Sequence, residues 1–199
     1  MEHIDVAQQT AAPSEADRSF RRFVLDLIET LFLAGLLFLG INAVSARVRV
    51  DGTSMLPTLE DGEFVLVNRL AYRFGPVQRG DIIVFHYPER PEEELIKRVI
   101  GLPGDAVEIA DGTVRIDQDI LVEEYVAASP QYTGTWLVPE DSLFVLGDNR
   151  NNSSDSHQWG MLPMKNVIGR ALLIYWPPPL WGVIEHGSAL AQTQQIGLR

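Results

Sequence analysis

The sequence predicts a mainly β protein, in which a single N-terminal transmembrane helix is followed by an antiparallel β-sheet or partly closed barrel. Two observations predict this fold. One apolar stretch near the N-terminus is long enough to cross a membrane as a helix. After it, short segments rich in Val, Ile and Phe follow one another between Gly, Pro and Asp residues, and no long helical stretch interrupts them.

The apolar stretch covers residues 23–44, FVLDLIETLFLAGLLFLGINAV, and is wholly apolar over residues 31–41. With its flanks it can cross about 30 Å of hydrocarbon. Asp26 and Glu29 lie toward one end of the span, where a charge costs less than at the bilayer centre. We therefore expect a transmembrane anchor over residues 23–44. The alternative is an amphipathic helix in the core of a soluble domain.

Basic residues around this stretch indicate its orientation. Arg18, Arg21 and Arg22 precede it, and Arg47 and Arg49 follow it. Because positive charge is enriched on the cytoplasmic side of a membrane, this narrow excess predicts a cytoplasmic N-terminus. We expect a single-pass protein of the plasma membrane, with residues 1–22 as a disordered cytoplasmic tail and the rest extracytoplasmic. Val44-Ser45-Ala46 has the spacing of a signal-peptide cleavage site, so a removable leader is the alternative to an anchor.

The remaining chain predicts a β domain over residues 45–180. Its expected strands cover residues 48–50, 63–69, 81–87, 94–100, 106–109, 113–116, 142–148 and 169–176. Asp111-Gly112 is a tight hairpin signal between two of them. Pro and Gly residues predict an irregular excursion over about 118–140. The run Pro177 to Pro179 cannot continue a sheet, so we expect a loose C-terminal tail over residues 181–199.

Composition excludes several classes of function. A net charge of −11 with scattered Lys and Arg argues against nucleic acid as a partner. The chain has no cysteine, which excludes disulfides and thiolate chemistry. The four histidines lack the close spacings of a zinc site. We therefore expect neither a metal nor a cofactor.

Ser54 and Lys97 are the first candidates for chemistry. Ser54 follows the apolar stretch in VDGTSMLPTL, and a serine hydroxyl needs a neighbouring base to become a nucleophile. In ELIKRVI, strand alternation gives Lys97 the same face as Leu95 and Val99. Burial there lowers the pKa of a lysine and makes its neutral amine available as a base. From the strand pattern alone, a lysine that reaches out to solvent at a strand edge is the alternative.

A third candidate is the polar segment GDNRNNSSDS over residues 147–156. Asp, Asn and Ser at this density favour an ordinary turn-rich loop. The same side chains can also orient a lysine amine, and Asp148, Arg150 and Asp155 can fix a loop by charge-assisted hydrogen bonds. The local sequence does not decide between these interpretations.

Four segments in this order resemble the motifs of bacterial type I signal peptidases: SMLPTL, RGDIIVF, KRVIGLPGD and GDNRNNSSDS. The resemblance covers roughly residues 50–175. It implies a membrane-anchored serine endopeptidase that removes signal peptides from exported preproteins, with membrane lipid as its other partner. It implies that Ser54 attacks the scissile carbonyl and that Lys97 is the general base. It further implies that Ser153 holds the lysine amine and that Asp148, Arg150 and Asp155 brace the site.

Two positions depart from the family pattern. Gly52 stands where some members have a serine that helps to bind the oxyanion, so we expect the Ser54 amide to be the main donor. His157 stands where many members have an arginine, and a Ser/His pairing is therefore an alternative to the Ser/Lys dyad.

The resemblance also implies a substrate groove with two shallow apolar pockets for small side chains. Met55 and Leu56 flank the nucleophile, and we expect the strand over residues 82–85 to pair with an extended substrate. Trp159, Trp176 and Trp181 are candidates for the lipid headgroup level, with burial in the domain core as the alternative.

Two other classes of function fit parts of the pattern. One is a self-cleaving Ser/Lys regulator like the SOS-response repressors, although the membrane helix and the lack of a DNA-binding segment count against it. The other is a noncatalytic, membrane-anchored β module that binds partners.

Overall fold

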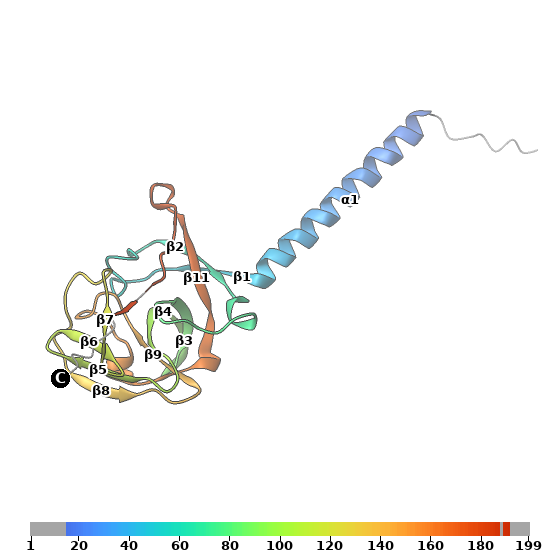
Figure 1. Cartoon of the computed structure of the whole chain (residues 1–199). Helices are drawn as coiled ribbons and strands as arrows, with labels where there is room; N and C mark the ends of the chain where they lie inside the picture. Colours follow the sequence, from blue (N-terminus) through green and yellow to red (C-terminus); the bar gives the residue numbers. More distant parts are fainter. Residues whose placement is uncertain (1–14, 188, 192–199) are drawn as a thin grey trace, which may run out of the picture. The chain divides into compact units, whose positions relative to one another are not determined.

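The computed structural model describes residues 15–187 and 189–191 (Figure 1). The chain divides into two compact units, residues 1–43 and residues 44–199. The first unit consists mainly of a long helix, and the second contains all of the described β-strands.

Helix α1 (Glu15–Val44) begins well before the predicted anchor. Residues 15–22 are therefore helical rather than part of a disordered tail, and residues 1–14 lie outside the described part of the chain. Within α1, Leu31 is 62% exposed and Phe38 is 58% exposed. One described helix, Arg21–Val44, is long and apolar enough to cross a membrane, with a mean hydropathy of 2.1. The exposed apolar surface of this helix is more favourable in hydrocarbon than in water.

Most strands of the second unit form one eight-stranded antiparallel sheet (Figure 1). In spatial order they are β1 (Ser45–Arg49), β2 (Phe64–Asn68), β11 (Val167–Trp176), β3 (Ile82–Tyr87), β4 (Arg90–Gly101), β9 (Ser142–Leu146) and β10 (Leu162–Pro163), and β12 (Gly182–Val183) pairs with β11. The end strands β1 and β10 do not meet, so the sheet is open. The prediction of a mainly β, antiparallel fold is confirmed.

A second antiparallel sheet contains five strands. Their order is β13 (Ala189–Ala191), β7 (Asp119–Val122), β6 (Thr113–Ile116), β5 (Ala106–Ala110) and β8 (Gly134–Leu137). The predicted hairpin turn between β5 and β6 is confirmed, because Asp111 and Gly112 both have positive φ, as such a tight turn requires. The irregular excursion predicted over about 118–140 is wrong at both ends, where β7 and β8 pair with β6 and β5.

The apolar faces of the strands form three buried clusters. One lies under the Ser54 segment and includes Met55, Leu59 and Ile96. Another joins the two sheets, since it combines Phe144 of β9 with Val107 of β5. Short helices complete the unit: η1 (Ala71–Arg73), α2 (Ser156–Trp159), η2 (Met164–Asn166) and η3 (Pro178–Leu180).

The segment over residues 182–191 crosses from one sheet to the other, and we call it the C-terminal strap. It adds β12 to the first sheet and β13 to the second. Between them, Ile184 is buried in the cluster under Ser54, and the Ile82 amide donates a hydrogen bond to His186 Nδ1 at 3.0 Å. The loose tail predicted over residues 181–199 is therefore wrong for most of the strap, because distant partners supply its pairing. Residues 188 and 192–199 lie outside the described part.

Candidate active site

Ser54 lies in a compact turn between β1 and β2, and neighbouring apolar side chains anchor this turn. Met55 and Leu59 are buried on either side of it, and the Leu59 amide donates to the Met55 carbonyl at 3.0 Å. The Asn149 amide donates to the Ser54 carbonyl at 3.0 Å, which ties the turn to the 147–156 segment. The Ser54 backbone is thus held on two sides, while its side chain is only partly buried.

Lys97 lies in the middle of β4 with its amine directed at the serine. Lys97 Nζ is 2.7 Å from Ser54 Oγ and 3.0 Å from the Ile96 carbonyl oxygen. Its side chain is enclosed, since the residue is only 3% exposed, so the alternative of a lysine reaching out to solvent does not hold. Burial lowers the pKa of Lys97 from 10.5 to about 8, although Asp155 and Asp148 act in the opposite direction.

Gly147 allows the 147–156 segment to approach the serine. A Cβ atom at Gly147 would lie 2.4 Å from the Ser54 carbonyl oxygen and 2.3 Å from Ser153 Oγ. No side chain fits in such a space, so the glycine permits the close approach. The Gly147 amide donates to Asp155 Oδ2 at 2.9 Å, which fixes the start of the segment.

Asp148 pairs with Arg98, the residue after Lys97. Arg98 Nε and Nη2 lie 2.8 and 2.7 Å from the two carboxylate oxygens of Asp148. Arg98 Nη1 also donates to the Gly80 carbonyl at 3.0 Å, and the Thr58 hydroxyl donates to Asp148. Arg98 is 1% exposed, so this bidentate ion pair is fully enclosed.

Arg150 pairs with Glu123, which follows β7. Both terminal nitrogens of Arg150 contact the Glu123 carboxylate, and Arg150 Nε donates to the Gly147 carbonyl at 3.1 Å. Nearby, the ring of Tyr125 covers the Arg98 guanidinium at 3.8 Å, and its hydroxyl donates to Glu123 at 2.9 Å. The second sheet thus supports the 147–156 segment through a connection that local sequence patterns could not identify.

Asp148 and Arg150, which the resemblance implies as braces, each form an ion pair in the structure. The two side chains bind distant residues rather than each other, although the Arg150 amide donates to the Asp148 carbonyl at 3.1 Å. The sequence patterns did not indicate Arg98 and Glu123 as the ion-pair partners of Asp148 and Arg150. The only signal for Arg98 was its place beside Lys97 in the KRVIGLPGD segment.

Ser153 lies inside the site without the hydrogen bond expected of it. The residue is buried, yet no described atom hydrogen-bonds its Oγ. The recorded bonds of Lys97 Nζ go to Ser54 and Ile96. Ser153 thus lies beside Gly147, but the expected bond to the lysine amine is not formed in this structure.

His157 is directed at Asp155. His157 Nδ1 lies 2.6 Å from Asp155 Oδ1, and its ring stacks on Tyr132 with centroids 3.9 Å apart. Asp155 also caps the short helix α2 by accepting from the His157 amide. The hydrogen bond recorded at Ser54 Oγ comes from Lys97, so the geometry favours the lysine over His157 as the base.

Gly52, which departs from the family pattern, has a backbone conformation that favours glycine. Its φ of 89° lies in the left-handed region, where a serine side chain is strained. Its amide donates to Asp61 Oδ1 at 2.7 Å. Among the described residues no backbone acceptor is recorded for the Ser54 amide, which leaves that amide available as an oxyanion donor.

The strand expected to bind substrate is not available. Strand β3 lies between β11 and β4, so both of its edges are already paired, and the prediction for residues 82–85 is wrong. Strand β4 instead pairs with β9 only from Arg98 onward. Among the described strands, none pairs with this edge of β4 from Arg90 to Lys97. Pairing order depends on long-range contacts and is not visible in a strand pattern.

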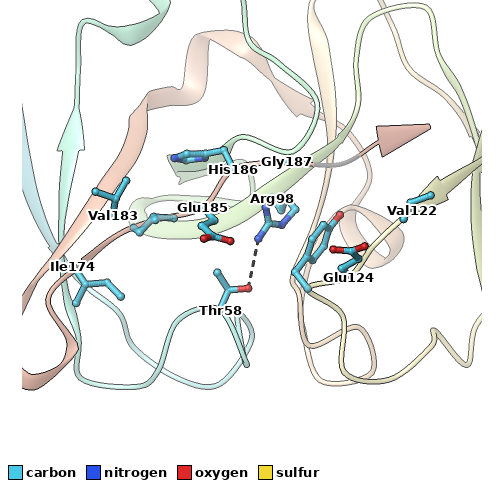
Figure 2. A pocket seen from close by; sticks show the side chains of 11 residues that line it. Thr58, Arg98, Val122, Glu124, Ile174, Val183, Glu185, His186 and Gly187 are labelled. Atoms are coloured by element: carbon cyan, nitrogen blue, oxygen red, sulfur yellow. Dashed lines mark hydrogen bonds between the residues drawn. The ribbon is translucent and has the colours of Figure 1, made fainter. Parts of the chain in front are cut away.

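A cavity of about 870 Å³ lies between the C-terminal strap and the Glu124–Tyr125 segment (Figure 2). Glu185 and His186 of the strap face Arg98 and Thr58 across it. Ser54 and Lys97 do not line this cavity. The described residues contain no cluster of three His, Asp or Glu side chains arranged to bind a metal.

The tryptophans proposed for the headgroup level separate into two groups. Trp159 is partly buried and packs edge-on against Tyr87, so it belongs to the core. Trp176 and Trp181 are 52% and 67% exposed.

The sequence matches the model of one protein family and is similar to several named proteins. The family described as "Signal peptidase, peptidase S26" matches residues 24–176. A protein named signal peptidase I from Leptolyngbya laminosa is 44% identical over 180 residues, which cover 86% of this chain and 87% of that protein. A probable signal peptidase I-1 from Synechocystis sp. is 45% identical over 170 residues, covering 81% and 87% respectively. The crystal structure of a signal peptidase I from Enterococcus faecalis shares 35% identity and covers 48% of this chain and 97% of that one, with a TM-score of 0.45.

Proposed function

The chain belongs to the signal peptidase family, peptidase S26, and from this premise we propose that it releases exported preproteins from their signal peptides through a Ser54/Lys97 dyad. It is a serine endopeptidase, and its substrates are exported preproteins. The observation that carries the dyad is the 2.7 Å hydrogen bond between the buried Lys97 amine and Ser54 Oγ.

Lys97 first acts as the general base. Its neutral amine takes the proton of Ser54 Oγ while this oxygen attacks the carbonyl carbon of the scissile peptide bond. The resulting ammonium gives the proton to the leaving amine, the C–N bond breaks and an acyl-enzyme remains. Water then attacks the ester, again with Lys97 as base. Because the pKa of Lys97 is lowered to about 8, kcat/KM should rise with pH through this value.

The Ser54 amide is the proposed main donor to the oxyanion. It lies on the residue that forms the covalent bond, and Gly52 offers no hydroxyl nearby. Asp148, Arg150 and Asp155 hold the 147–156 segment, which in turn holds the Ser54 carbonyl through Asn149. Ser153 belongs to this segment, and its hydroxyl, which has no hydrogen bond in the described part of the structure, is proposed to turn toward the lysine amine and orient it.

The substrate is proposed to lie extended along the unpaired edge of β4, ahead of Lys97. An added strand there forms main-chain hydrogen bonds without displacing β9. The apolar side chains next to this edge and to Ser54 include Met55 and Ile96. Such a lining suits the small residues that precede a signal-peptide cleavage site, and we expect two shallow pockets here.

Helix α1 is proposed to anchor the enzyme in the plasma membrane, with the N-terminus cytoplasmic and the β domain outside. The arginine distribution supports this orientation. Exposed Trp176 and Trp181 are proposed to contact lipid at the headgroup level. Because the chain has no native cysteine, single cysteines placed at Ser14 and at Ser129 report the orientation directly through labelling by a membrane-impermeant maleimide. We expect labelling from outside only at the second position.

The alternative of a removable leader requires cleavage within β1. Ser45 and Ala46 pair with Asn68 and Val67 of β2, so a protease would have to unpair this strand. Membership of the family likewise does not favour the self-cleaving regulator or the noncatalytic module.

Cleavage of a preprotein with an Ala-X-Ala site tests the proposed function. Full-length wild type, Ser54→Ala and Lys97→Ala are assayed side by side in detergent or lipid. We expect both variants to lose activity while remaining folded by circular dichroism. Cleavage by Ser54→Ala at the wild-type rate would refute the nucleophile. Activity retained in Lys97→Ala alone would transfer the role of base to His157.

A further inference from the structure

Two buried carboxylates stabilise the charged form of Lys97, and their partners differ in one chemical respect. Asp155 has the larger effect and Asp148 the smaller. The partner of Asp148 is the Arg98 guanidinium, which stays protonated at any pH at which a protein is folded. The partner of Asp155 is His157, and histidine is the type of side chain that can change its charge near neutral pH. Only the charge of Asp155 therefore has a countercharge that can be switched.

Asp155 also connects His157 to the nucleophile. One carboxylate oxygen accepts from His157 Nδ1 at 2.6 Å, and the other accepts from the Gly147 amide at 2.9 Å. Gly147 in turn lies directly against the Ser54 backbone. The path from the imidazole to the dyad is thus a chain of contacts through a fully buried carboxylate.

The surroundings of His157 hold its ring in place. Tyr132, which precedes β8, stacks on one face of the ring with an interplanar angle of 12°. The charges that act on Tyr132 are those of Asp155, Arg150 and Glu123, and the last two neutralise each other as an ion pair. Among the described residues, Asp155 is the charged group that forms a direct contact with the imidazole.

We propose that His157 is a positioning residue for the dyad: by gaining or losing a proton beside Asp155, it changes how strongly that carboxylate holds the proton of Lys97. This inference rests on the proposed function, because it requires Lys97 to be the base. With a neutral imidazole the charge of Asp155 is uncompensated, and it favours the Lys97 ammonium. With an imidazolium the charge is compensated, and Lys97 releases its proton at a lower pH.

Permanently neutral and permanently charged replacements test the proposal. kcat/KM is measured from pH 5 to pH 10 for full-length wild type, His157→Gln and His157→Arg, and each profile is normalised to its own plateau, so that a loss common to all pH values drops out. His86→Gln is the matched control, because His86 is an exposed histidine on β3 whose ring hydrogen-bonds to the Pro91 carbonyl and to no other described residue.

We expect the rising limb of the kcat/KM profile of His157→Arg to lie about half to one pH unit below that of His157→Gln, since a nearby charge shifts a pKa by this order. The wild-type profile should follow the glutamine variant at alkaline pH and move toward the arginine variant at acid pH. At the acid end its normalised activity should exceed that of His157→Gln several-fold. The profile of His86→Gln should superimpose on that of wild type. Normalised limbs that superimpose for wild type and both His157 variants would overturn the proposal.

A reciprocal measurement on the protein without any His157 variant keeps the proposal testable if the variants do not fold. Coupling between two sites acts equally in both directions. In NMR titrations, the His157 ring signal of Lys97→Ala should therefore titrate at higher pH than that of wild type, because the neighbouring ammonium is gone. Identical titrations would overturn the proposal. Full activity of Lys97→Ala would instead refute the proposed function, so the two failures are distinguishable.

Discussion

The two sides of strand β4 each enclose a basic side chain, and successive residues of this strand provide them. Lys97 is 3% exposed and Arg98 is 1% exposed. On the arginine side, a carboxylate binds the guanidinium at two points, and the aromatic ring of Tyr125 covers it. On the lysine side, the amine contacts a hydroxyl and a backbone carbonyl, both of them neutral.

The difference shows that burial alone does not determine what a buried cation does. A buried charge with a directly bound countercharge stays charged and holds structure, as Arg98 does. A buried amine without one tends to lose its proton, as the lowered pKa of Lys97 indicates. The same strand thus provides a fixed brace and a base at adjacent positions.

Lys97→Arg should produce the largest effect, because it converts the lysine side of β4 into a second permanent cation. An arginine stays protonated and cannot take the Ser54 proton. We expect preprotein cleavage to fall by about 10²- to 10⁴-fold, the usual contribution of a general base. The measurement is kcat/KM in detergent, with circular dichroism as the control for folding. Substantial activity in this variant would remove the dyad.

Arg98→Met should break the arginine side by leaving Asp148 buried without its countercharge. Removal of one partner from a buried ion pair costs about 3–5 kcal/mol of the free energy of unfolding. Urea unfolding of the full chain measures this cost. The matched control is the double variant Arg98→Met/Asp148→Leu, which removes both charges and should recover part of the loss. Asp148→Leu is measured as well. If the double variant lost as much unfolding free energy as Arg98→Met and Asp148→Leu lose together, the result would contradict a direct pairing.

Lys97→Met should act on stability in the opposite direction to Arg98→Met. Unfolded Lys97 binds a proton up to its ordinary pKa of 10.5, and folded Lys97 only up to about 8. The unfolded state therefore holds more protons between these pH values, and the stability of wild type rises with pH through this window. Below this pH window, the burial of the charged amine lowers the free energy of unfolding of wild type by its full amount, about 3 kcal/mol for such a shift in pKa. We expect Lys97→Met to be inactive but more stable than wild type at pH 7 by about 1–3 kcal/mol in urea unfolding. The gain should shrink toward pH 10.5, and a variant destabilised at pH 7 would contradict the account.

Substitutions of Tyr125 should produce the smallest effects on the arginine side of β4. Tyr125→Phe keeps the ring over Arg98 and removes only the hydrogen bond to Glu123, at a cost of about 1 kcal/mol. Tyr125→Leu also removes the ring and should cost about 0.5–2 kcal/mol more. Equal unfolding free energies for the two variants would show that the ring does not stabilise the guanidinium.

Local sequence patterns predicted the parts of the fold that depend on neighbouring residues. The strand periodicity and the Asp111-Gly112 turn were sufficient for most strands and for the β5–β6 hairpin. The same patterns failed where segments distant in the sequence determine the strand pairing. Strand β3 is paired on both edges because β11 returns to it from far along the chain. The strap pairs with β11 and β7, but it is short and follows three prolines, so its own residues predicted a loose tail.

The site shows the same division. Alternation along β4 put Lys97 on an apolar face, and the structure buries it. The motifs named Asp148 and Arg150, yet not their partners Arg98 and Glu123, because an ion pair between distant segments leaves no spacing to detect. Ser153 reached the site without forming its expected bond, since the rotation of a hydroxyl depends on atoms that a sequence does not place.

The C-terminal strap bears on how the enzyme is made. A ribosome adds residues 182–191 after the strands that they join, and until then β7 lacks β13, the cluster under Ser54 lacks Ile184, and the Ile82 amide lacks His186. The nucleophile and its base are synthesised long before these contacts can form. A nascent chain therefore carries both reactive residues in an unfinished framework, and the framework around them is completed only after the strap has been made.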